Sequence, residues 1–136
     1  MLKVKTIKQN ISFDASPEEL YYLFMDPYKH AAFTGSDVII SNEINGKFNI
    51  FNGYCKGYNI ELAIAQKIVQ AWNFAENGWP ENHYSICKFS FEPNGNKTKL
   101  KFEQTGIPEH KVEQLKKGWK EYYWIPMKAY LKINTD

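Results

Sequence analysis

The sequence predicts an α+β fold: a strongly curved antiparallel sheet of about seven strands, wrapped around a long C-terminal helix, with one or two short helices after the first strand. Three observations predict it. Asn-Gly pairs separate strand-like runs, a helix-start signal follows the first of these runs, and an amphipathic pattern occupies the end of the chain. A sheet with one buried face needs a cover, and one long amphipathic helix can provide it.

Asn-Gly pairs mark the predicted turns, at Asn45-Gly46, Asn52-Gly53, Asn77-Gly78 and Asn94-Gly95. This dipeptide is a strong hairpin signal, because a type I′ turn needs φ > 0 at both central residues. The runs 84–92 and 97–104 flank the last pair and alternate in polarity. Such alternation indicates strands with one buried face. We therefore interpret Lys97, Lys99 and Lys101 as a solvated strand face and not as a nucleic-acid patch.

A capped helix follows the first strand. Ser16, Pro17 and Glu19 supply an N-cap, a proline in the first turn and a capping-box glutamate. The helix should end near Asp26-Pro27, because the residue before a proline is pushed out of the α region. A short second helical turn is expected over residues 28–33.

The second helix should run over residues 109–131. Its apolar residues recur at three- and four-residue spacing, which is typical of one buried stripe: Val112, Leu115, Trp119, Tyr122, Tyr123, Met127 and Tyr130. Pro126 lies inside this pattern. It removes the hydrogen bond to Tyr122 and should bend the helix.

Composition limits the class of protein. A chain of 136 residues fits one domain, which we place at 1–136. Hydrophobic residues make up 43%, which excludes a disordered chain. No apolar run approaches the ~20 residues of a membrane span, and the N-terminus lacks a signal-peptide core, so we expect a cytoplasmic protein without a membrane partner. All 17 basic residues are lysine, which counts against nucleic acid as a partner, since arginine supplies the bidentate contacts.

The sequence contains no pattern typical of catalysis. Its histidines, His30, His83 and His110, are scattered, whereas a metal site needs three or four converging ligands. There is no phosphate loop or nucleophile motif. We therefore expect no enzyme activity, no cofactor and no metal. Cys55 and Cys87 should be reduced, because strands separated by one other lie roughly 9–10 Å apart, beyond the ~7 Å reach of a disulfide.

Several segments, in order over residues 11–131, resemble one known family. They include Ser16-Pro17-Glu18-Glu19-Leu20-Tyr21, Gly46-Lys47-Phe48, Ile68-Val69-Gln70-Ala71-Trp72, Trp79-Pro80-Glu81-Asn82-His83-Tyr84, Gly106-Ile107-Pro108 and Gly118-Trp119. The chain is similar to the activator of heat-shock protein 90 ATPase homologue family, a branch of the START-like (SRPBCC) helix-grip superfamily. The segment 79–84 resembles the C-terminal domain of the eukaryotic co-chaperone.

The resemblance implies a single START-like domain and leaves two functions open. Many members of the superfamily hold a small apolar ligand between sheet and helix. The co-chaperone instead binds a heat-shock protein 90 chaperone and stimulates its ATPase, but its principal contact lies in an additional N-terminal domain, which the resemblance over residues 11–131 does not include. We therefore expect a stand-alone, non-enzymatic domain that binds a small hydrophobic molecule, with the co-chaperone role as the alternative.

Aromatic residues carry the candidate site. Trp72, Trp119 and Tyr123 should face the interior, either as packed core or as the walls of a pocket. The pocket hypothesis takes Gln104 or the Tyr123 hydroxyl as polar anchor, and its full lining is Trp72, Cys87, Phe89, Phe102, Gln104, Trp119, Tyr123 and Met127. Trp124 lies about 120° from the centre of the helical stripe. It is either an exposed residue that binds a partner or a cap over the rim of the sheet.

Overall fold

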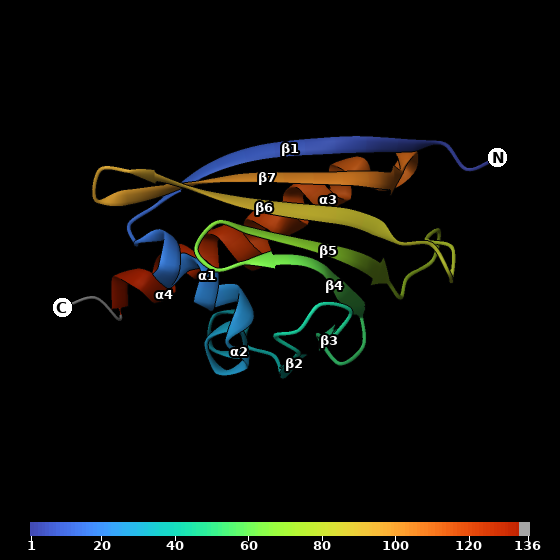
Figure 1. Ribbon diagram of the computed structural model, residues 1–136. Helices are drawn as coiled ribbons and strands as arrows, with labels where there is room; N and C mark the ends of the chain where they lie inside the picture. Colours follow the sequence, from blue (N-terminus) through green and yellow to red (C-terminus); the bar gives the residue numbers. More distant parts are fainter. Residues whose placement is uncertain (134–136) are drawn as a thin grey trace.

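The computed structural model describes residues 1–133, and its elements follow the predicted order (Figure 1). The strands are β1 (Val4–Phe13), β2 (Val38–Ile40), β3 (Lys47–Ile50), β4 (Cys55–Ala63), β5 (Lys67–Phe74), β6 (Ser85–Asn94) and β7 (Lys97–Pro108). The helical segments are α1 (Pro17–Met25), α2 (Pro27–Thr34), η1 (Glu109–Lys111), α3 (Val112–Trp119), η2 (Lys120–Trp124) and α4 (Ile125–Ile133).

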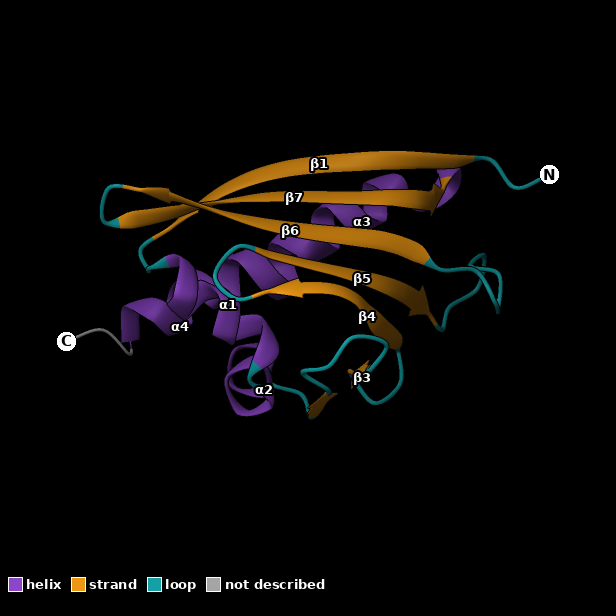
Figure 2. Cartoon of the chain, viewed as in Figure 1, coloured by secondary structure: helices purple, strands orange, loops and turns teal. Residues whose placement is uncertain are grey.

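All seven strands form one antiparallel sheet in the order β1-β7-β6-β5-β4-β3-β2. The first strand pairs with the last, and the others follow the chain as a meander, so β1 and β2 are the two edges. Figure 2 shows α3 running across one face of the sheet, with α1 and α2 beside the lower end of the long helix. The predicted fold class is confirmed.

Local signals fix the two short helices. The Ser16 hydroxyl accepts a hydrogen bond from the Glu19 N–H, and the Glu19 carboxylate accepts one from the Ser16 N–H, each at 3.1 Å. The α1 helix ends at Asp26, whose carboxylate caps α2 by accepting from the Tyr28 N–H at 2.8 Å. Pro27 then opens α2, so the predicted boundary is confirmed.

The Asn-Gly turns differ in type. Asn52 and Gly53 have φ of 54° and 88°, the two positive values that a type I′ turn requires. Asn94 instead pairs with Lys97 in the last hairpin, so Gly95 and its successor form the two-residue connection. There φ is positive (63°) at Gly95 alone, as in a type II′ turn, where glycine takes the first central position. The hairpin is where the sequence predicts it, one residue out of phase with a type I′ turn.

The C-terminal helix is continuous but not uniform. Between α3 and α4 it widens into a π-turn, closed by a bond from the Ile125 N–H to the Lys120 carbonyl. Pro126 follows at once. It has no N–H for the Tyr122 carbonyl, and its ring would crowd that carbonyl in a regular α-helix. The irregularity predicted at the proline therefore takes the form of a π-turn in the preceding residues.

The π-turn changes which side chains face the core, because one extra residue rotates the following positions by about 100°. Trp124 is only 5% exposed, and its indole N–H donates to Gln9 Oε1 on β1 at 2.8 Å. Tyr122, which the spacing placed in the buried stripe, is 59% exposed. The interpretation of Trp124 as an exposed partner contact is thus wrong. The alternative holds, since Trp124 covers the edge strand β1.

Trp119 is central to the core between sheet and helix. It is 3% exposed, and its ring centroid lies 4.5 Å from that of Phe102, 5.1 Å from Trp72 and 6.0 Å from Phe89. Its indole N–H donates to Gln104 Oε1 at 2.8 Å. An unpaired buried N–H would be unfavourable by ~1–3 kcal/mol, so this bond fixes how deeply the helix sits on the sheet.

The substitution Trp119→Ala should lower the free energy of unfolding by ~3–5 kcal/mol, the usual range for a large buried aromatic ring. Urea denaturation of the purified protein measures it. Tyr28→Ala removes a ring that is 85% exposed and should change stability by less than about 0.5 kcal/mol. A loss below about 1 kcal/mol for Trp119→Ala would contradict its central position.

Candidate functional site

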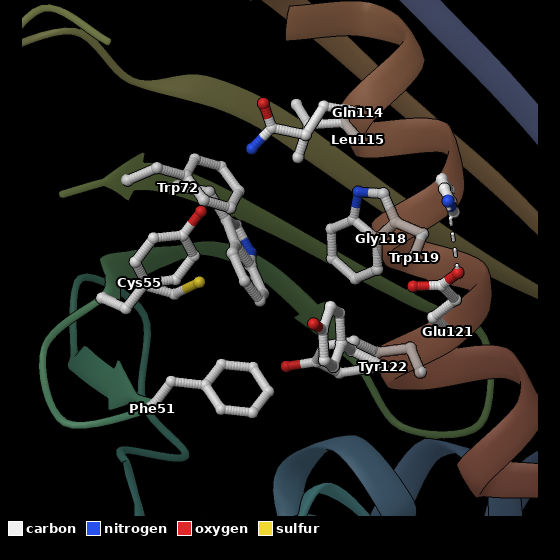
Figure 3. A pocket seen from close by; sticks show the side chains of 13 residues that line it. Phe51, Cys55, Trp72, Gln114, Leu115, Gly118, Trp119, Glu121 and Tyr122 are labelled. Carbon is white, nitrogen blue, oxygen red and sulfur yellow. Dashed lines mark ion pairs between the residues drawn. The ribbon is translucent and has the colours of Figure 1, made fainter. Parts of the chain in front are cut away.

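An open groove of about 500 Å³ runs between the C-terminal helix and the end of the sheet near β3 (Figure 3). One wall comes from α3 and η2, and the other from the β3–β4 turn, β4 and β5. The lining residues are Phe51, Tyr54, Cys55, Trp72, Phe74, Gln114, Leu115, Lys117, Gly118, Trp119, Glu121, Tyr122 and Tyr123. A concave site of this size with aromatic walls falls within the range that holds small molecules.

Glu76, in the β5–β6 loop, forms a polar cluster at one end of the groove. Its Oε2 accepts hydrogen bonds from the Tyr54 hydroxyl at 2.5 Å and from Gln114 Nε2 at 3.0 Å. Its Oε1 has no hydrogen-bond partner among the described residues, but lies 3.5 Å from Lys111 Nζ in a mostly buried ion pair. This cluster joins β4 and the β5–β6 loop to the C-terminal helix.

The Tyr54 hydroxyl and the Cys55 thiol of the groove wall are held in their neutral forms. Burial, followed by the hydrogen bond to the Glu76 carboxylate, raises the pKa of Tyr54 well above its usual range. Burial also raises the pKa of the Cys55 thiol, and likewise that of Cys87 in the core; both cysteines are free. A thiol acts as a nucleophile in its thiolate form. Neither cysteine is therefore activated as a nucleophile.

Three of the predicted pocket residues line the groove: Trp72, Trp119 and Tyr123. The other five are buried beside it, each 2% exposed or less: Cys87, Phe89, Phe102, Gln104 and Met127. Phe89 and Phe102 pack on each other, with ring centroids 5.1 Å apart. The interior between sheet and helix is filled at these positions, and the groove lies to one side, toward β3.

Both predicted polar anchors are already engaged. Gln104 accepts from the Trp119 indole through Oε1 and donates to Ser85 Oγ through Nε2 at 2.9 Å. The Tyr123 hydroxyl bonds to His30 Nε2 at 2.8 Å. These polar atoms hold the core together, so the expectation that they orient a ligand is not supported by their geometry.

His30, on α2, forms a buried polar site that the sequence does not predict, and its side chain is 2% exposed. Its Nδ1 lies 2.8 Å from the Phe24 carbonyl, which can only accept a hydrogen bond, so we assign the proton to Nδ1. Its Nε2 then accepts a hydrogen bond from the Tyr123 hydroxyl. Burial lowers the pKa of His30 to about 4, against the opposing effect of the Phe24 hydrogen bond. The partners come from α1 and η2, so local sequence contains no signal for this site.

The outer face of the sheet is charged and solvated. Lys101 pairs with Glu92, and Lys67 with Glu61, each at 2.7 Å. Lys97, Lys99 and Lys101 are exposed, so the prediction that they lie on the solvent-facing side of a strand is confirmed. Among residues 1–133, no three His, Cys, Asp or Glu side chains gather in a way that could hold a metal ion. No helix in this part of the chain has the length and apolarity of a membrane span.

Comparison with known proteins identifies the family. Residues 14–132 match the family described as Activator of Hsp90 ATPase homolog 1-like protein. The chain belongs to this family. The resemblance of its short segments to the heat-shock protein 90 activator homologues is thus confirmed.

Curated relatives are longer than this chain. The activator of 90 kDa heat shock protein ATPase homolog of Dictyostelium discoideum is 36% identical over 117 residues, which cover 85% of the chain and 30% of that protein. The human activator homolog 1 is 32% identical over 129 residues, covering 93% of the chain and 38% of that protein. The chain thus spans about a third of the relatives it matches.

A solved structure of similar length also matches. It is an HSP90 activator from Plasmodium falciparum, with a TM-score of 0.85 and 27% identity, covering 93% of this chain and 96% of that one. An Aha1 dimer from Colwellia psychrerythraea, at 18% identity and a TM-score of 0.77, shares the fold. Both likenesses extend over nearly the whole sheet and its helix.

Acid should weaken the fold through His30. Because the folded pKa of about 4 lies below the ordinary 6.5, folding favours the neutral ring. This contribution to the free energy of unfolding is fully present above about pH 6.5 and is lost as pH falls toward 4. The largest loss that His30 can cause is on the order of 3 kcal/mol. We expect the free energy of unfolding, from urea titrations at several pH values, to fall more steeply in the natural protein than in His30→Gln.

The difference between the two titrations isolates His30 from the carboxylates, which titrate in both proteins. Equal slopes would show that the ring is charged or hydrated in the folded state. The assignment of Nε2 as an unprotonated acceptor would then be wrong.

Proposed function

We propose that this protein binds a heat-shock protein 90 chaperone of its own cell and stimulates its ATPase, and that the groove mouth makes the contact. The groove mouth consists of Phe51, Tyr54 and Tyr122. The observation that carries the proposal is the exposure of aromatic rings around a concavity in a chain of this family. Tyr122 is 59% exposed and Tyr54 38% exposed.

The shape of the molecule favours a surface contact over an enclosed site. The interior under Trp119 is filled with rings, while the groove opens outward beside it. Tyrosine is enriched where a few residues dominate protein–protein affinity, because its ring is large and rigid and its hydroxyl tolerates water. An exposed ring cluster beside a groove is therefore a reasonable anchor for a partner.

The comparisons support a chaperone as that partner. The human and Dictyostelium relatives are described as activators of the 90 kDa heat shock protein ATPase, although the chain matches only about a third of each. The Plasmodium activator has almost the same extent as this chain. This agreement in extent supports one domain of this size as the unit of contact with the chaperone.

Substituting Tyr122→Ala should weaken chaperone binding by roughly tenfold or more, since a central aromatic anchor commonly contributes at least ~1.4 kcal/mol. The measurement is a titration of the organism's own chaperone, followed by its rate of ATP turnover. Tyr28→Ala is the matched control, because Tyr28 is more exposed (85%) and lies on α2, outside the groove lining. If the natural protein neither binds the chaperone nor raises its turnover, the proposal fails. An equal loss in both variants would place the contact elsewhere.

A small hydrophobic molecule in the groove is the second candidate. The observation in its favour is the space itself, about 500 Å³ between Trp72, Phe74, Leu115 and Tyr123. Rings of this kind bury a large area for a small loss of side-chain freedom. Because the predicted anchors Gln104 and the Tyr123 hydroxyl are engaged, the groove would recognise such a molecule mainly by shape and apolar contact.

An uncharged fluorescent probe, N-phenyl-1-naphthylamine, should bind the native protein saturably at a single site. Its emission should rise on titration, and the fluorescence of Trp72 and Trp119 should be quenched at the same stoichiometry, because both line the groove. Emission that rises without saturation would indicate non-specific surface binding and would count against a ligand site.

A further inference from the structure

Gly118 has no structural reason to be glycine. It lies within α3, where glycine is less favourable than alanine, and its φ is not in the left-handed region. A Cβ built there would have one neighbour within 4 Å, Tyr122 Cδ2 at 4.0 Å. An alanine would therefore fit without displacing anything. Because Gly118 has no side chain, the part of the groove wall that it forms stays open.

Other glycines of the chain show the contrast. A Cβ at Gly57 would lie 1.8 Å from the Ala71 carbonyl oxygen, and one at Gly46 would lie 2.0 Å from Ser41 Oγ. At Gly57 the neighbouring backbone leaves no room for a side chain. At Gly46 the Ser41 side chain and the Glu43 carbonyl, at 2.9 Å, do the same. Gly118 faces free space instead, so its effect is on the groove and not on the fold.

Phe51, across the groove, has an unfavourable backbone conformation. Its φ is 57°, in a run of three left-handed residues with Asn52 and Gly53. Asparagine and glycine tolerate this region, but a phenylalanine is an outlier there. The turn hydrogen bond from the Tyr54 N–H to the Phe51 carbonyl, at 3.1 Å, encloses only Asn52 and Gly53. A type I′ turn at those two residues does not require a positive φ at Phe51 itself.

The β3–β4 turn, which contains Phe51, and the π-turn, which contains Tyr122, meet at the groove mouth. The ring centroids of Phe51 and Tyr122 are 6.1 Å apart in an edge-to-face arrangement, and Figure 3 shows the Phe51 ring pointing across the groove toward Tyr122. Tyr122 lies within the π-turn, which turns its side chain toward solvent. Such turns are frequent at functional sites. Three locally unfavourable choices, a helical glycine, a left-handed phenylalanine and a π-turn, thus converge on one cavity. Such convergence is typical of a site kept for binding.

We propose that the groove binds a small molecule with an uncharged aromatic ring. The ring lies against the helix backbone at Gly118, a position that we call the seat, and beside the Phe51–Tyr122 ring pair. The proposal rests on the second candidate function and names its ligand class. A ring fits because the walls offer edge and face contacts to another ring. The ring is uncharged because the two charged side chains of the lining, Lys117 and Glu121, have opposite signs and lie 3.9 Å apart, so the groove carries no net charge that would favour a charged ligand.

The test compares two substitutions at one position. Gly118→Leu fills the seat, and Gly118→Ala adds a single methyl group; both add helix propensity and should leave the midpoint of thermal unfolding equal or higher. We expect binding of N-phenyl-1-naphthylamine to weaken roughly threefold in Gly118→Ala and about thirtyfold or more in Gly118→Leu. Glu113→Leu places the same side chain at an exposed position of α3 outside the groove lining and should bind the probe as the natural protein does.

The ligand class is tested with a charged analogue. 8-Anilinonaphthalene-1-sulfonate carries similar rings and a sulfonate, and should bind at least about tenfold more weakly than the neutral probe. Equal affinities would overturn the assignment of an uncharged ring. If the folded Gly118 variants bind the probe as tightly as the natural protein, the ligand does not lie against Gly118. Binding elsewhere in the groove would remain possible to measure in the same titration. If the natural protein does not bind the neutral probe, the second candidate function fails and this inference fails with it, whereas chaperone binding is decided by its own assay.

Discussion

The hydrogen bond between the Trp119 indole and Gln104 is the contact on which the rest of the structure depends. It is the first link of a buried chain: Gln104 donates to Ser85 Oγ, and Ser85 donates to the Trp72 carbonyl. The chain begins on the helix and crosses β7, β6 and β5. Because each buried polar group needs its partner, the helix can neither slide along the sheet nor rotate on it without leaving several groups unpaired. The rings around Trp119 then fill the space that this docking defines.

A second buried chain fixes the opposite wall of the groove. The Trp72 indole donates to Gln70 Oε1 at 3.0 Å, Gln70 donates to Asn59 Oδ1 at 3.0 Å, and Asn59 donates to the Ser41 carbonyl at 2.7 Å. This chain ties the loop between β2 and β3 to the middle of the sheet. Both walls are therefore held by satisfied polar networks, which are rigid when complete. The groove stays open because its walls are held apart, and not because the core packs poorly.

The two candidate functions use the same part of the molecule. Phe51 and Tyr122 belong to the groove mouth that would meet a chaperone, and they also flank the space that would receive a ring. A molecule seated at Gly118 would change the position or freedom of these two rings. Binding of one partner would then alter the affinity for the other, and any such coupling would be reciprocal by linkage. The arrangement follows from a filled core, which leaves this concavity at the side of the helix.

Features that depend on local chemistry could be predicted from the sequence. The capping box at Ser16, the helix boundary at Pro27 and the alternation around Lys99 each follow from neighbouring residues, so the element order and the fold class could be predicted. Tertiary structure decided the rest. Spacing along the last helix assumes a regular α-helix, so the π-turn that buries Trp124 could not be inferred from periodicity. The buried site of His30 and the position of the groove depend on segments far apart in the chain. Whether inward-facing rings fill a core or line a cavity depends on how those segments pack, and alternation along one strand contains no information about that volume.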